Sequence, residues 1–110
     1  HQGTKFAERF DANAYIRIAD MWAEFDIRDQ APDGTFKIAL EGFRRAGIPA
    51  LVFSIDTDCC FRPAEQKDFV EQFKAADIPV EFHTIVSTKG HDSFLLEPEL
   101  YAEPIRRVLG

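Results

Sequence analysis

Apolar side chains recur at helical spacing through the first half of the chain. Over residues 12–26 they repeat every three or four positions, which predicts an amphipathic helix that Asp11 caps. The apolar face of this helix consists of Tyr15, Ile18, Ala19, Trp22 and Phe25. A Pro-Asp-Gly turn follows within residues 26–34, and the same spacing then predicts a second helix over 35–47, ending at Gly47.

In the second half of the chain, two short continuous apolar runs predict strands that are buried on both faces. These runs are ALVFSI (50–55) and PVEFHTIV (79–86). Between them, the periodic segment 63–77 opens with a proline, which suits the first turn of a helix. The tail, 98–109, predicts a last helix whose regular part begins only a few residues before Pro104, because proline lacks the N–H that a helix interior needs.

A strand, a helix and a strand within about forty residues form a βαβ unit, which requires two parallel strands joined by a right-handed crossover. A parallel sheet of two strands leaves both outer edges open and needs helices on both faces. We therefore expect these strands to be the margin of a larger sheet. The predicted fold class is α/β, with the 110 residues as part of a domain.

Composition and charge exclude several classes of function. A chain of 110 residues with 45% hydrophobic and 29% charged side chains has the make-up of one globular domain at most. The formal charge of −6, without a basic stripe, argues against nucleic acid and against anionic membranes as partners. No apolar run has the length of a signal peptide core or a membrane span, so we expect a soluble protein with no membrane partner.

The two cysteines, Cys59 and Cys60, are adjacent, so they cannot join distant segments and do not have the spacing of zinc ligands. This usage favours a reducing, cytoplasmic location and predicts no metal site. A neighbouring carboxylate at Asp58 raises a thiol pKa rather than lowering it. We therefore expect the two cysteines to pack as small apolar side chains.

The loops that follow the two predicted strands carry the candidate chemistry. In an open α/β sheet, functional groups gather at the carboxyl ends of the strands. Asp56 and Asp58 follow the first strand and His91 follows the second. Neighbouring strands are about 4.8 Å apart, so an aspartate and the histidine are within reach of each other. A carboxylate at one imidazole nitrogen fixes the tautomer and leaves the other nitrogen as a general base.

A nucleophile is missing from this arrangement. The chain has no G-x-S-x-G elbow: Ser54 lies in a predicted buried strand, and Ser93 is too close to His91 in sequence. An acid followed by a histidine is the order of an α/β-hydrolase chain whose serine lies upstream. His83, inside the second predicted strand, fits a half-buried sheet residue better than a ligand. Trp22 fits a core position, or a helix–helix or dimer contact, better than an acyl pocket.

Three stretches of the chain resemble successive signatures of the homoserine O-acetyltransferase family. They are RFDANAY (9–15), TDCCFRPAEQ (57–66) and GHDSFL (90–95). The resemblance covers nearly the whole chain as the C-terminal third of such an enzyme. It implies the last βαβα of an α/β-hydrolase core over 48–110, preceded over 1–47 by helices of an inserted lid through which the family forms homodimers.

The resemblance also implies an activity, which belongs to methionine biosynthesis. By a ping-pong route, a serine takes an acetyl group from acetyl-CoA, as co-substrate, and passes it to the hydroxyl of L-homoserine, without a resident cofactor. Asp58 matches the acid of the Ser-Asp-His triad and His91 its base, while Asp92 is implied to meet the amino group of the substrate. Since the serine is absent, we expect the 110 residues alone to be inactive.

Three other functions stay open from the sequence. A close relative could use succinyl-CoA, or could accept serine in place of homoserine. An esterase could carry the same acid and histidine and pass the acyl group to water. A non-catalytic α/β binding module would need neither Asp58 nor His91.

Overall fold

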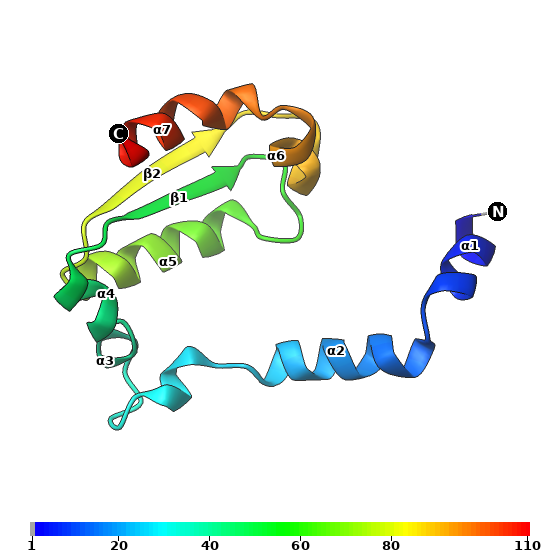
Figure 1. Cartoon of the computed structure of the whole chain (residues 1–110), viewed down its shortest axis with the longest axis horizontal. Coiled ribbons are helices and arrows are strands. Elements are labelled where there is room, and N and C mark those ends of the chain that lie inside the picture. Colours follow the sequence, from blue (N-terminus) through cyan, green and yellow to red (C-terminus); the bar gives the residue numbers. More distant parts are fainter. Residues whose placement is uncertain (1) are drawn as a thin grey trace.

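The computed structural model describes residues 2–110, and the side chains of residues 3–110. Its centre is a sheet of two parallel strands, β1 (Ala50–Ile55) and β2 (Val80–Ile85), which pair along all six residues. Helix α5 (Pro63–Ala75) covers one face of this sheet and α7 (Glu99–Leu109) covers the other (Figure 1). The predicted α/β class and the parallel pair are confirmed.

The alternation of side chains along the strands divides the core into two clusters. On the α5 side, Ala50 and Val80 pack against buried residues of α5 and of the segments beside it, namely Leu40, Phe73, Ala76 and Ile78. On the α7 side, Phe53 packs against the buried residues Ile55, Ile85 and Tyr101. Each helix therefore buries one face of the strand pair.

One predicted helix needs correction. The second predicted helix, 35–47, consists of α3 (Phe36–Ala39) and α4 (Glu41–Ala46), because the backbone of Leu40 leaves helical geometry at φ −92° and ψ 3°. Leu40 is only 3% exposed and lies in the α5 cluster. The spacing of apolar residues is unchanged by this bend, so it could not reveal the break. Gly47 ends α4 with a positive φ of 64°, as predicted.

The sequence patterns do not predict several short elements. In all there are four in the described chain: α1 (Gln2–Arg9), the 3₁₀ helix η1 (Ile27–Gln30), the 3₁₀ helix η2 (Gly90–Asp92) and α6 (Ser93–Leu96), the last two following β2. Each is too short for its apolar periodicity to be distinguished from a loop.

Helix α2 (Ala12–Glu24) is capped by Asp11, as predicted, and ends two residues earlier than expected. Asp11 accepts hydrogen bonds from the N–H groups of Asn13 and Ala14 at 2.7 and 3.1 Å. The helix runs apart from the sheet and its two covering helices (Figure 1). No residue of the described α2 is buried, and its Trp22 is 68% exposed, so the expected core position is wrong within this chain.

The aromatic side chains of α2 contact α1 and the loop after β1: the ring of Tyr15 lies 6.2 Å from that of Phe6, and the ring of Trp22 lies 6.3 Å from that of Phe61. Among the described residues, no helix is both long enough and apolar enough to cross a membrane.

Two fully buried serines provide a test of how the core treats polar groups. Ser54 in β1 is 1% exposed, and its hydroxyl has no hydrogen-bond partner among the described residues. Ser93 is 0% exposed, and its hydroxyl bonds both Tyr101 and Glu97. We expect Ser54→Ala to leave the free energy of unfolding unchanged or raised, and Ser93→Ala to lower it by about 1–3 kcal/mol. Urea unfolding of both variants measures this, and an equal loss in both would contradict it.

Candidate active site

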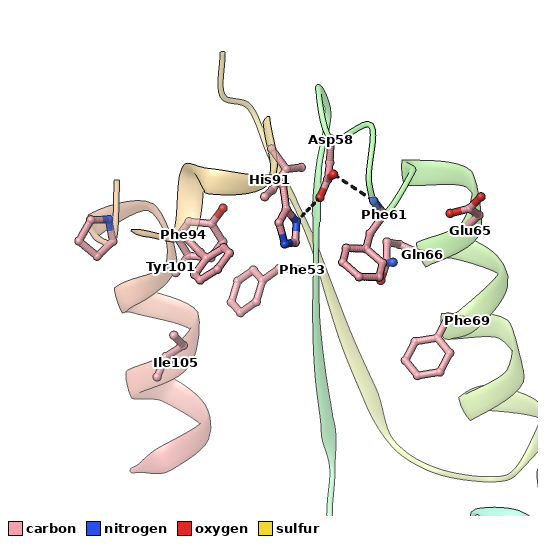
Figure 2. Close-up of a pocket in the computed structure, with 12 residues that line it drawn as sticks. Phe53, Asp58, Phe61, Glu65, Gln66, Phe69, His91, Phe94, Tyr101 and Ile105 are labelled. Atoms are coloured by element: carbon pink, nitrogen blue, oxygen red, sulfur yellow. Dashed lines mark hydrogen bonds and ion pairs between the residues drawn. The ribbon is translucent and has the colours of Figure 1, made fainter. Parts of the chain in front are cut away.

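The loops after β1 and β2 bring Asp58 and His91 into contact. The Nδ1 atom of His91 lies 2.9 Å from Oδ2 of Asp58 (Figure 2). The side chain of Asp58 is 4% exposed, whereas that of His91 is 41% exposed. The second ring nitrogen, Nε2, is thus free to meet another group. In a neutral imidazole, a carboxylate at Nδ1 favours the tautomer whose proton is on that nitrogen and leaves Nε2 to act as a general base.

Asp58 is held as a carboxylate by the turn that it begins. Its Oδ1 atom accepts from the backbone N–H groups of Cys60 and Phe61 at 2.8 and 3.0 Å. Burial by itself would raise the pKa of Asp58, but the N–H groups of Phe61 and Cys60 and the contact with His91 together hold that pKa below its ordinary value. The acid therefore stays charged next to the imidazole.

Asp56 and Thr57 connect the two loops and do not contact His91. Asp56 accepts at Oδ1 from the N–H of Ser87 at 3.0 Å. The Thr57 hydroxyl donates to the carbonyl oxygen of Ser87 at 2.5 Å and accepts from the N–H of Gly90 at 3.2 Å. Thr57, the residue before the acid, is thus bonded to Gly90, the residue before the histidine. Among the aspartates of the described chain, only Asp58 bonds the imidazole.

Two aromatic rings flank the imidazole, and neither was singled out from the sequence. The ring of Phe61 lies 5.1 Å from the His91 ring, and that of Phe94 lies 5.5 Å away in an edge-to-face arrangement. In Figure 2 they lie on opposite sides of His91. Phe94 belongs to the same GHDSFL stretch, but no periodicity indicated that it faces the histidine. The imidazole therefore has an aromatic neighbour on each side, while its side chain stays 41% exposed.

The imidazole stands at the end of an apolar cleft of about 820 Å³. The cleft runs between α5 and α7 along the edge of β1 that has no partner strand in the described chain (Figure 2). Its lining contains the titratable residues Asp58, Glu65 and His91 and is otherwise largely aromatic and aliphatic, with Phe53, Ile55, Phe61, Gln66, Phe69, Phe94, Pro98, Tyr101 and Ile105. The Asp58–His91 relay, in which the acid bonds Nδ1 and Nε2 is left as the base, therefore opens onto a space large enough for a small organic molecule.

The described serines do not supply a nucleophile to this cleft. Ser54 is buried in β1, and the hydroxyls of Ser87 and Ser93 both donate to Glu97. None of the three lines the cleft. In the described part of the chain, no group of three histidine, cysteine or acidic side chains could hold a metal ion.

The cysteines are exposed and unpaired, so the expectation that they pack as small apolar side chains is wrong. Partial desolvation and then the neighbouring Cys59, Asp58 and Asp92 raise the pKa of the Cys60 thiol, which opposes a role as an activated nucleophile.

Asp92 is exposed on η2 and does not line the cleft. His83 is half-buried beside Glu81 on β2, as expected of a sheet residue.

Comparisons with known proteins agree with the motifs. The chain is similar to a homoserine O-acetyltransferase of Haloferax volcanii, with 36% identity over 106 residues, and to one of Geotalea uraniireducens, with 30% identity over 109 residues. It is also similar to a homoserine O-succinyltransferase of Nitrosomonas europaea, with 38% identity over 106 residues. These alignments cover 96%, 99% and 96% of this chain and 24%, 28% and 27% of the relatives.

The chain therefore spans about a quarter of the length of these relatives and corresponds to their C-terminal portion. The resemblance to the homoserine O-acetyltransferase family is confirmed, with the matched part nearer a quarter than the expected third. No family model matches the chain. No solved structure matches it either.

The lowered pKa of Asp58 predicts an acid-sensitive contribution to stability. A carboxylate whose pKa is lower in the folded chain stabilises it fully above the unfolded value, about 3.9, and loses that contribution as the pH falls through the lower folded value. The native chain should therefore lose stability relative to Asp58→Asn as the pH falls below about 4. Urea unfolding of both proteins over a pH series measures the difference, and a gap that does not change with pH would contradict this assignment.

Proposed function

We propose that the chain is the C-terminal part of a homoserine O-acyltransferase with an α/β-hydrolase fold, in which Asp58 and His91 are the acid and the base of the catalytic triad. The observation that carries this proposal is their contact at 2.9 Å beside an open cleft. It occurs in a chain that is similar over nearly its whole length to homoserine O-acyltransferases. The parallel strands that end at the two loops support the core of this fold.

The division of the chain follows from the same proposal. Residues 48–110 would form the last βαβα of the core, and residues 1–47 would belong to an inserted helical lid. The exposed apolar side chains of α2, among them Ile18, Met21 and Trp22, support a surface that another part of the protein covers. A homodimer formed through these helices is the partner that we propose for this surface.

The described residues can carry out the proton transfers of a ping-pong reaction. As a serine from the remaining part of the protein attacks the thioester carbon of acetyl-CoA, Nε2 of His91 takes the hydroxyl proton and then gives it to the departing CoA sulfur. In the second half-reaction, Nε2 takes the proton of the homoserine hydroxyl, whose oxygen attacks the acyl-serine, and returns it to the serine. Asp58 holds the Nδ1 proton and stabilises the imidazolium in both halves. No resident cofactor takes part.

Succinyl-CoA is the second candidate donor, because the Nitrosomonas europaea relative, at 38% identity, is named a homoserine O-succinyltransferase. The two reactions use the same acid and base, so the donor is decided by side chains around the acyl group. CoA release measured with acetyl-CoA and with succinyl-CoA, each with and without homoserine, distinguishes these donors. CoA release that is equally fast without homoserine would instead indicate an esterase.

The two acids that follow β1 test the relay itself. Asn at position 58 offers a donor where the imidazole N–H needs an acceptor, and the analogous change in a serine protease costs about 10⁴ in turnover. In the full-length protein, we expect Asp58→Asn to lower the rate of acylation by at least about 10². Asp56→Asn, which alters only a link to Ser87, should change it less than about tenfold.

Pre-steady-state acylation with the acyl-CoA measures both variants, and thermal midpoints close to that of the native protein serve as the control for folding. A larger effect of Asp56→Asn would transfer the acid role to that residue. Mild effects of both variants would remove the relay from the proposed mechanism.

Asp92 follows the base directly in the chain and is exposed on η2, outside the lining of the cleft. We propose that it holds the amino group of homoserine. Asp92→Asn should then weaken the second half-reaction roughly ten- to hundredfold, the worth of one charge-assisted hydrogen bond, with acylation nearly unchanged. Single-turnover rates of the two half-reactions measure this. An equal loss in both would indicate that Asp92 helps to place His91 instead.

A further inference from the structure

The turn that carries His91 is closed by a small network of hydroxyl groups around the carboxylate of Glu97. Ser87 and Ser93 both donate to the same atom, Oε2, the latter at 3.1 Å. Ser87 precedes the histidine by four positions and Ser93 follows it by two, so both sides of the turn meet at one oxygen. The N–H of Glu97 also donates to the carbonyl oxygen of Ser93 at 2.8 Å.

The direction of each hydrogen bond in the network follows from counting protons. The Ser87 hydroxyl accepts from the N–H of Lys89 at 3.0 Å, and the Ser93 hydroxyl accepts from the hydroxyl of Tyr101 at 2.9 Å. Each serine then has a single proton left to donate, and both protons go to Glu97. An ionised carboxylate accepts and does not donate, so it satisfies both serines at once.

The hydroxyl groups of this network are buried, so each needs a hydrogen-bond partner within the protein. Ser93 is 0% exposed, and Ser87 and Tyr101 are each 6% exposed, so water cannot easily replace a missing partner. A buried hydroxyl without its acceptor is unfavourable, and the turn would have to open to reach solvent. Asp58, in contrast, is fixed by the backbone of its own turn. The position of the base thus depends on Glu97, together with the Thr57 link to Gly90.

We infer that Glu97 is a positioning residue for His91, holding the turn so that Nδ1 stays against Asp58 and Nε2 faces the cleft. This inference rests on the proposed function for its catalytic consequence, but the placement itself can be measured without catalysis. The histidine side chain is 41% exposed, and Asp58 is the one polar side chain bonded to it among the described residues. If the turn opened, the imidazole would move away from Asp58, and its preference for the tautomer with the proton on Nδ1 would weaken.

The first experiment measures the tautomer of His91 by nitrogen NMR of the chain labelled with ¹⁵N-histidine, with His91→Asn assigning the signal. In the neutral imidazole of the native chain, we expect the proton on Nδ1. Glu97→Leu should lower the ratio of the Nδ1–H to the Nε2–H tautomer about fivefold, the factor set by one net hydrogen bond. Glu97→Gln, whose amide oxygen can accept from both serines, should restore it, and Glu99→Leu, an exposed neighbour, should leave it unchanged.

If Glu97→Leu does not fold, the variant Tyr101→Phe takes its place in the test. It deletes only the hydroxyl that donates to Ser93, and it should lower the same ratio about twofold. An unchanged ratio in a folded Glu97→Leu chain, or in Tyr101→Phe where the former does not fold, overturns the inference. A loss in Glu97→Gln as large as in Glu97→Leu also overturns it, because an acceptor would then not be sufficient.

The second experiment measures acylation by the full-length protein with the same substitutions. We expect at least about a tenfold loss for Glu97→Leu and recovery in Glu97→Gln. If the native protein forms no acyl-enzyme, the proposed function fails, and the tautomer ratio alone decides whether Glu97 positions His91. If the native protein is acylated and Glu97→Leu is acylated equally fast, the function stands and the positioning role fails.

Discussion

The parallel register of β1 and β2 determines where the acid and the histidine lie, because both strands end at the same edge of the sheet. The loops that leave this edge begin side by side, and their first residues bond one another through Asp56, Thr57 and Ser87. The contact between Asp58 and His91 is the outermost of these links. An antiparallel pairing of the same strands would place the two loops at opposite ends.

Hydrogen bonds from the backbone stabilise the charge of the buried acid that bonds the histidine. A buried carboxylate is unfavourable unless it is bonded, and Asp58 is bonded by two backbone N–H groups as well as by the imidazole. Asp58 therefore stays ionised although its side chain is nearly buried. Since the turn supplies these N–H groups only at that position, the acid is defined by its turn as much as by its distance from the strand.

The apolar surface of the chain is distributed unevenly. One part forms the cleft along the free edge of β1, and another covers α2, whose large side chains include Met21 at 71% and Phe25 at 72% exposure. Surfaces of this kind are normally covered by another part of a protein. The chain spans about a quarter of the length of its relatives, and both surfaces agree with a proposed larger assembly.

Local periodicity and short motifs were sufficient to predict the strands, the capped helix α2, the helix α5 and the two loops in which the acid and the histidine lie. Strand spacing leaves both Asp56 and Asp58 within reach of His91, and the family resemblance selects Asp58, which is the acid that bonds the ring. The tertiary structure alone shows that Phe61 and Phe94 flank that ring. It also decided the bend at Leu40 and the network around Glu97. These features depend on contacts between residues far apart in the chain or on the exact path of a turn, and neither leaves a periodic signal in the sequence.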